Sequence, residues 1–352
     1  MLKINHAILH AFDFETGSCS LSEHELDMDE KLVKSYVRRH LRRCVASDQN
    51  MHGEFDQNSG FAEELELYLG HRTHFIDLSK QIAEFFWDTL RRCDDLVQAD
   101  LLVADFEETA EAPKDATDEE LEKSFSGEPT RRFAVILLPR SQTFMHSIEH
   151  PSGGAFNEIV RHDATLPNPS AKVNTYVLVD CKTMAIDYSD KLRTVAEAEV
   201  WIMQNLLLKC SREPSSREVM QTVTELVQEV AETGNVSVVE AIGQAKAAMT
   251  RAANVEERLE PVAIGKQVFE DEPRLAERYE ERTREAELPE EVAVAPAAAR
   301  RLAKSHRIRT DTGVDITFPS DMSANSDYLA FEHAPDGSIS IVIRNVRSIE
   351  NR

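Results

Sequence analysis

The sequence has little cysteine and no paired cysteine motif. Five cysteines are spread over 352 residues, and no two of them form a C-x-x-C pair. An odd, dispersed set favours a reducing compartment over a disulfide framework. We therefore expect five free thiols: Cys19, Cys44, Cys93, Cys181 and Cys210.

Long apolar runs are also missing. No stretch approaches the roughly 18 consecutive apolar residues that a membrane-spanning helix needs. Residues 1–6 do not lead into the apolar core of a signal peptide. The sequence therefore predicts a cytoplasmic protein without membrane contact.

Positive charge is scarce in this chain. Lys and Arg number 40 against 63 Asp and Glu, which gives a formal net charge of −23. Because Lys and Arg hold the phosphates of duplex DNA, net charge alone argues against DNA binding. The carboxylates, however, gather in residues 107–128 and 270–291. A basic surface can therefore exist elsewhere on the protein.

The glycine motifs of nucleotide-binding proteins are absent. Neither G-x-x-x-x-G-K-[ST] nor G-x-G-x-x-G occurs, and Gly153-Gly154 alone does not specify a phosphate cradle. We therefore expect no nucleotide hydrolysis and no cofactor.

What the sequence does contain is an ordinary globular composition with alternating strand and helix signals. Hydrophobic residues make up 41% and charged residues 29%, and the length suits two or three structural units. Apolar and β-branched runs predict about five strands in the first half, and apolar residues at helical spacing predict two helices there. The expected strands are residues 3–12, 19–26, 100–106, 133–138 and 173–179, and the expected helices are 29–46 and 78–93.

Helical patterns dominate the middle of the chain. They cover residues 201–208 and 217–231, and a third helix starts near residue 238. Two capping boxes support the last two starts, because a Ser precedes a Glu by three residues in each. These boxes are Ser215 with Glu218 and Ser237 with Glu240.

Strand signals return after a linker near residues 288–299. Residues 314–318, 328–333 and 338–346 read as strands, with a turn at Pro335-Asp336-Gly337 between the last two. Ile339, Ile341 and Ile343 alternate and are expected to share one core face. The apolar edge near Ile341 also favours a homodimer.

These patterns predict an α+β protein. An N-terminal α/β sheet unit (1–192) carries an acidic loop (107–129), a helical unit with a charged linker follows (193–298), and a small antiparallel β unit ends the chain (299–352).

The order of these pieces resembles the bacterial nucleoid-associated proteins of the NdpA/YejK type. Four stretches carry the resemblance, and the last is the most specific, with Gly313-Val314-Asp315-Ile316-Thr317-Phe318-Pro319 at its start. The stretches are residues 4–10, residues 75–86 leading into 99–103, residues 166–169 before 176–179, and residues 313–346. The resemblance implies association with the nucleoid and contact with DNA or with DNA-handling proteins. It implies no catalytic residue and supplies no motif of binding residues.

Two basic segments are the candidate DNA-binding sites, because phosphate binding needs several cations close together. On the helix at 29–46, four arginines fall opposite the apolar stripe, although a solvated face paired with this protein's many carboxylates explains them slightly better. Residues 300–309 hold six basic side chains and no acidic one, and we expect the larger contribution from them. The candidate residues are Arg38, Arg39, Arg42 and Arg43, and Arg300, Arg301, Lys304, His306, Arg307 and Arg309.

Two sets of residues raise the question of metal chemistry. His146 to His150 matches H-x-x-E-H, but Pro151 and two glycines follow at once and leave little room for the required helix. We therefore expect ordinary loop histidines there, and the same for His71 and His74.

The second set is Asp180-Cys181-Lys182, which resembles half of a metal-dependent nuclease site, with Asp163 or Glu158 as a second carboxylate. Charged strand ends are common for reasons of solvation alone, so no metal site is expected.

The sequence thus predicts a non-catalytic, nucleoid-associated protein that contacts the backbone of double-stranded DNA with little sequence preference. Two alternatives stay open. One is an acidic subunit that docks on a DNA-handling enzyme or mimics DNA. The other is a metal-dependent nuclease that uses Asp180 and Lys182.

Overall fold

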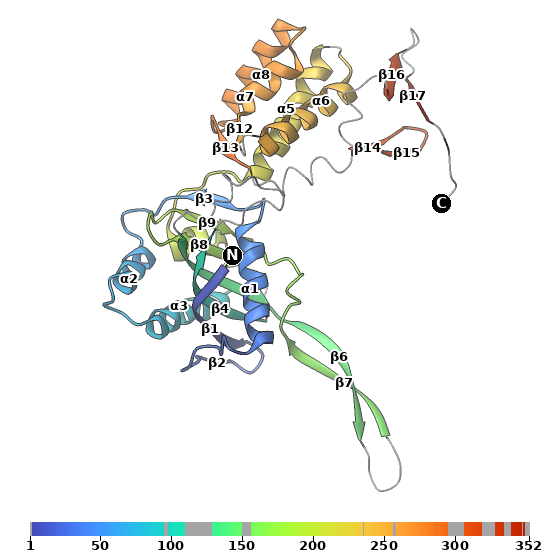
Figure 1. The fold of residues 1–352 in the computed structure, drawn as a ribbon. Coiled ribbons are helices and arrows are strands. Elements are labelled where there is room, and N and C mark those ends of the chain that lie inside the picture. The colour runs from blue at the N-terminus through green and yellow to red at the C-terminus, as the bar shows by residue number, and fades with distance from the viewer. Residues whose placement is uncertain are drawn as a thin grey trace, which may run out of the picture. The chain divides into compact units, whose positions relative to one another are not determined.

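A computed structural model of the chain describes most of its residues, and they form two compact units. The described residues are 2–94, 98–109, 129–149, 156–234, 236–255, 258–294, 306–318, 328–333, 339–346 and 348. The first unit comprises residues 1–45 and 50–213, and the second comprises 46–49 and 214–352. Figure 1 shows the elements of both units.

The first unit is built on one antiparallel sheet of seven strands, in the order β2-β1-β4-β5-β8-β9-β3. The three longest strands of the sheet, β1, β4 and β5, are neighbours. Leu102 of β4 pairs in register with Leu9 of β1 on one side and with Ile136 of β5 on the other. The strands are β1 (Leu2–Asp13), β2 (Ser18–Ser20), β3 (Met51–Gly53), β4 (Ala99–Glu108), β5 (Thr130–Pro139), β8 (Tyr176–Asp180) and β9 (Ile186–Ser189).

Helices cover both faces of this sheet. On one face α1 (Lys31–Val45) packs Val37, Leu41 and Cys44 against side chains such as Leu102. On the other, α2 (Gly60–Leu69) and α3 (Phe75–Leu90) pack with neighbours such as Leu101. Because successive strand residues point to opposite faces, a strand covered on both sides buries nearly all of its side chains. This explains why β4 is buried from Ala99 to Phe106, where the two acidic residues, Asp100 and Asp105, pair with Arg140 and Arg131.

The predicted α+β class is confirmed, but the sheet differs from the expected five strands. The second predicted strand (19–26) shrinks to β2, and two short strands, β3 and β9, add to the sheet and pair with each other. The predicted acidic loop begins later than expected, because Glu107 and Glu108 belong to β4. The rest of that loop, residues 110–128, lies outside the described residues.

The predicted helix at 201–208 is a π-helix, η1 (Ile202–Leu208), that follows a hairpin of β10 (Leu192–Val195) and β11 (Ala198–Trp201). The carboxylate of Asp190 accepts hydrogen bonds from the backbone N–H groups of Met203 (2.7 Å) and Gln204 (3.2 Å). Burial raises the pKa of Asp190 to about 6. This carboxylate thus accepts hydrogen bonds from N–H groups at the start of η1 that have no partner within the helix.

The first unit also contains a hairpin, which lies between β5 and β8 in the chain and is not part of the seven-stranded sheet. Strands β6 (Ser141–Glu149) and β7 (Phe156–Thr165) pair with each other as a two-stranded sheet. In Figure 1 this green hairpin extends away from the seven-stranded sheet. Its residues 150–155 lie outside the described ones.

The second unit contains four helices in its described part: α5 (Ser216–Gly234), α6 (Val238–Val255), α7 (Pro261–Val268) and α8 (Pro273–Glu285). The expected capping box at Ser215 forms in both directions, since Ser215 Oγ accepts from Glu218 N–H (3.2 Å) and Glu218 Oε2 accepts from Ser215 N–H (2.9 Å). At the start of α6, Ser237 Oγ accepts from Glu240 N–H (3.5 Å), which is one half of the expected box. Much of the charged stretch 270–291 is helix α8, which buries Tyr279 against α7. A methyl group at Gly265 would overlap that tyrosine ring.

Short antiparallel strands end the described chain. Strand β14 (His306–Arg309) pairs with β15 (Asp315–Phe318), and β16 (Leu329–His333) pairs with β17 (Ile339–Ile343). The expected turn at residues 335–337 lies outside the described residues. The predicted core face is only partly right, because Ile341 packs against Phe318 and Leu329 whereas Ile343 is 60% exposed. No helix in the described ranges is long and apolar enough to span a membrane.

One buried histidine of the sheet makes the stability of the first unit depend on pH. His10 is fully buried; its Nδ1 accepts from Ser22 N–H (3.1 Å), and its Nε2 lies 3.1 Å from Ser79 Oγ. Only the neutral ring with its proton on Nε2 satisfies both contacts, because a second proton on Nδ1 would face the Ser22 donor. Burial, aided by Lys80, lowers the pKa of His10 to about 4.

We expect the first unit to lose stability as the pH falls from about 6.5 to 4, because the unfolded chain then binds a proton that folded His10 excludes. The loss attributable to His10 is roughly 3 kcal/mol. Urea unfolding at several pH values measures it. A His10→Gln variant, whose amide can make the same two contacts without titrating, should show a flatter pH dependence. Equal slopes for both proteins would contradict this assignment.

Candidate nucleic-acid interface

Helix α1 carries one of the two predicted basic segments, and it contains no acidic residue. Its 15 residues include six cationic side chains: Lys31, Lys34, Arg38, Arg39, Arg42 and Arg43. The buried residues Val37, Leu41 and Cys44 recur at helical spacing, and three of the arginines, Arg39, Arg42 and Arg43, lie outside this stripe and are exposed. The amphipathic pattern therefore presents a positively charged stripe on a protein with a net charge of −23.

The four arginines of α1 differ in exposure. Arg39, Arg42 and Arg43 are exposed, whereas Arg38 is half-buried and its Nε is shielded from solvent. Within the ranges that the structure describes, neither Arg39 nor Arg43 has a carboxylate within ion-pair distance. Surface pairing, which the sequence could not exclude, thus does not account for Arg39 and Arg43.

Helix α1 also contains a buried histidine, His40. His40 is 1% exposed and stands edge-on to the ring of Tyr36, with 4.7 Å between the ring centroids. Burial lowers the pKa of His40. The ring is therefore neutral near pH 7, and the positive charge of α1 comes from its lysines and arginines alone.

The second basic segment lies mostly outside the described residues. Arg300, Arg301 and Lys304 are among residues that the structure does not describe. The backbone of His306, Arg307 and Arg309 is described and forms strand β14, which was not predicted from the sequence. Strand β14 belongs to the second unit and α1 to the first, so the structure assigns the two basic segments to different units.

Asp180, which was considered for a nuclease site, has a structural role in the fold. Asp180 Oδ1 accepts hydrogen bonds from the backbone N–H groups of Lys182 (2.8 Å) and Thr183 (2.9 Å) at the turn between β8 and β9. Burial alone would raise the pKa of Asp180, but these hydrogen bonds lower it. Glu158 and Asp163, the proposed second carboxylates, lie on β7. Asp180 thus serves as a turn-stabilising residue.

The H-x-x-E-H match does not lie on a helix. His146 and Glu149 are part of strand β6, so the helical spacing that zinc binding by this motif requires is not present, and the loop expected there is a strand. His150 lies outside the described residues. His71 and His74 flank the turn between α2 and α3. Among described residues, no group of three or more His, Cys, Asp or Glu is arranged to hold a metal ion.

Sequence reasoning missed the exposed apolar side chains on the β6–β7 hairpin. Phe144, Met145 and Ile159 are 72%, 53% and 76% exposed. The register pairs Phe144 with Arg161 and Met145 with Val160, which places apolar side chains on both faces of the ribbon. The available signal was Gly153-Gly154, which separates two runs of strand-forming residues.

Comparison with known families supplies one further finding. The model of the family NA37, described as nucleoid-associated protein YejK, matches residues 8–350. A comparison with curated proteins finds no match.

Proposed function

Since this chain belongs to the NA37 family of nucleoid-associated proteins, we propose that it binds the backbone of double-stranded DNA without catalysing a reaction. Membership confirms the resemblance drawn from the sequence. The observation that carries the proposal is the stripe of α1, where Arg39, Arg42 and Arg43 are exposed on a helix without acidic residues. Clustered cations of this kind bind phosphates and carry no base-reading geometry of their own.

The second contact in this proposal is the segment 300–309. The sequence ranked it above α1 because the arginines of α1 had an explanation as ion-paired surface residues. Arg39 and Arg43 have no such partner among described residues, so we assign both segments to DNA binding. We place the protein at the nucleoid in the cytoplasm, in keeping with its family.

A salt titration tests the proposed function. We expect the full chain to retain labelled duplex DNA on a filter, with log K falling linearly against log salt concentration by about 0.9 for each phosphate contact. Two duplexes of equal length and unrelated sequence should bind with similar affinity, because phosphate contacts read no bases. No retention at low salt, or strong preference for one sequence, would contradict the proposal.

A second candidate function is docking on a DNA-handling protein, and the β6–β7 hairpin favours it. The exposed Phe144 and Ile159 share one face of the ribbon and Met145 lies on the other, and exposed apolar side chains gathered on one hairpin favour a protein contact. Residues 141–165 hold three carboxylates (Glu149, Glu158 and Asp163) against Arg161, so the hairpin suits a protein better than DNA.

Photo-crosslinking from position 144 distinguishes the partners of this hairpin. Crosslinks to a DNA-handling protein would support docking, and crosslinks between two copies would show that this hairpin contacts a second copy of the chain. A similar yield from position 158, an exposed polar position on the same hairpin, would contradict a specific apolar contact.

A further inference from the structure

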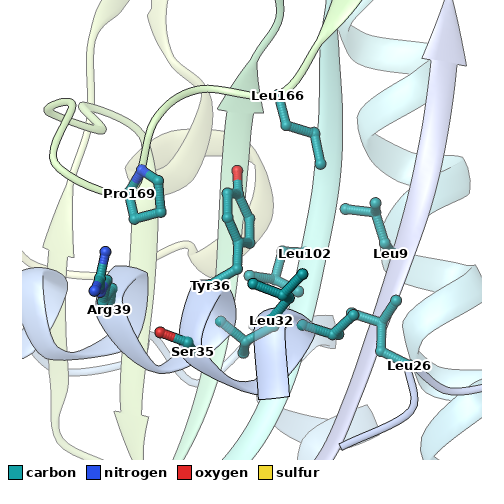
Figure 2. A pocket seen from close by; sticks show the side chains of 11 residues that line it. Leu9, Leu26, Leu32, Ser35, Tyr36, Arg39, Leu102, Leu166 and Pro169 are labelled. Carbon is teal, nitrogen blue, oxygen red and sulfur yellow. The ribbon is translucent and has the colours of Figure 1, made fainter. Parts of the chain in front are cut away.

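A cavity of about 490 Å³ lies beneath the N-terminal half of α1. Figure 2 shows Leu9, Leu102 and Leu166 around it, with Leu32 and Tyr36 contributed by the helix. Its size and apolar lining are those of small-molecule sites, which commonly measure about 300–1,000 Å³.

The cavity exists because α1 covers the sheet unevenly. The second half of the helix buries Val37, Leu41 and Cys44 against the sheet. In the first half Leu32 is 78% exposed, and Val33 and Tyr36 are only half-buried. Leu102 of β4 is 1% exposed, but Leu9 of β1 is only half-buried. The helix therefore leaves apolar side chains such as Leu9 and Leu32 accessible at the cavity, which is costly unless something covers them.

The polar groups of the cavity favour one kind of head group. Of the described residues that line it, Arg39 carries the positive charge, and none is a carboxylate. Figure 2 places Arg39 beside Pro169, at one side of the apolar residues. Arg39 has no ion-pair partner in the described ranges, so its guanidinium is available. The hydroxyl of Tyr36 donates to Pro167 O (2.9 Å), so Tyr36 supplies its ring as a wall.

We propose that this cavity binds a free anionic amphiphile, a small molecule with an aliphatic body and one carboxylate. The aliphatic body lies among the leucines, and the carboxylate pairs with Arg39. The apolar lining fits the aliphatic body of such a ligand, and the guanidinium of Arg39 fits its negatively charged carboxylate. This site is separate from the proposed DNA function, although both use Arg39.

Calorimetric titration of the full chain with decanoate and with decanol, in the absence of DNA, tests the proposal. We expect one decanoate per chain, bound more tightly than decanol. Arg39→Gln should weaken decanoate binding about tenfold, and Arg39→Lys should restore most of it, because a charge-assisted contact is lost and then regained. Decanol binding should not change in either variant.

Two further variants locate the ligand. Leu166→Trp fills the cavity from its loop and should abolish binding of both compounds, with folding checked by circular dichroism. Arg43→Gln removes a cation of the same helix that does not line the cavity, and it should leave decanoate binding unchanged. Unchanged binding in Leu166→Trp, or equal losses in Arg39→Gln and Arg43→Gln, would overturn the proposal. Binding to phosphatidylglycerol vesicles that decanoate does not displace would also overturn it. Because no DNA is present, this test can fail or succeed independently of the DNA proposal.

Discussion

Changing Arg39, Arg42 and Arg43 together to Glu is expected to lower the affinity for duplex DNA at least tenfold near physiological salt. These three side chains are exposed on a helix without carboxylates, so each can reach a phosphate. Loss of three phosphate contacts should also make the slope of log K against log salt less negative by about 3. Arg38 is left intact because its half-buried side chain contributes to packing.

The control is a second triple variant with the same change in net charge, made at three cations that do not form a cluster. Arg92, Lys172 and Lys191 are exposed cations of the same unit that lie outside α1. Changing them to Glu alters the net charge equally but removes no cluster, so we expect a much smaller loss. Equal losses in both triple variants would show that only net charge matters and that α1 is not the contact.

A matching variant of the second segment completes the comparison. Arg300, Arg301, Lys304 and Arg307 changed to Glu should weaken DNA binding and flatten the salt slope in the same manner. If this variant binds with unchanged affinity and slope, residues 300–309 are not part of the interface.

Replacing Arg131 with Met is expected to destabilise the first unit by about 3–5 kcal/mol at pH 7. Arg131 Nη2 lies 2.6 Å from Asp105 Oδ2, and Asp105 is fully buried. Tyr68 Oη (2.7 Å) and Asn5 Nδ2 (3.2 Å) also donate to this carboxylate. Burial alone would raise the pKa of Asp105, but these donors, Arg131 foremost, lower it. Without Arg131, a buried charge is left with neutral partners only.

The pH dependence of this variant identifies the cause. In the Arg131→Met variant, Asp105 lacks its charged partner, so its pKa should be raised and it should become neutral on acidification. The loss in free energy of unfolding caused by the substitution should therefore become smaller between pH 7 and pH 5. Urea unfolding followed by tryptophan fluorescence reports on the first unit, because Trp87 and Trp201 both lie in it. Lys3→Met breaks the exposed pair with Glu107 (3.2 Å) and should cost less than about 1 kcal/mol. A deficit that does not change with pH would point to lost packing instead.

Elements with strong local signals could be predicted from the sequence. Helices α1, α3, α5 and α6 carry apolar residues at helical spacing over 15 or more residues. The cap of α5 needs only Ser215 and Glu218, three residues apart. Strands β4 and β5 contain the apolar runs 101–104 and 133–138, as expected of strands covered on both faces. The fold class and the family follow from these elements and their order.

Elements that depend on distant partners could not be predicted. Strand β3 has three residues, and it pairs with β9, where Met51 lies opposite Tyr188. The β10–β11 hairpin turns at Ala196 and Glu197, both with positive φ, although neither residue is typical of such a turn. The backbone N–H groups at the start of η1 are hydrogen-bonded to Asp190, which precedes this helix in the chain by more than ten residues. In each case the stabilising partner is not a sequence neighbour.

The concentration of positive charge in the first unit can be read from the sequence, because four arginines lie within six residues of one helix. Which of these arginines a ligand can reach depends on the folded structure. It shields the Nε of Arg38 and leaves Arg39 and Arg43 without a carboxylate among the described residues. It also leaves a cavity beneath the first half of α1, with Arg39 among its lining residues. Exposure and ion pairing depend on which residues the fold brings near each side chain, and periodicity along one helix carries no information about those neighbours.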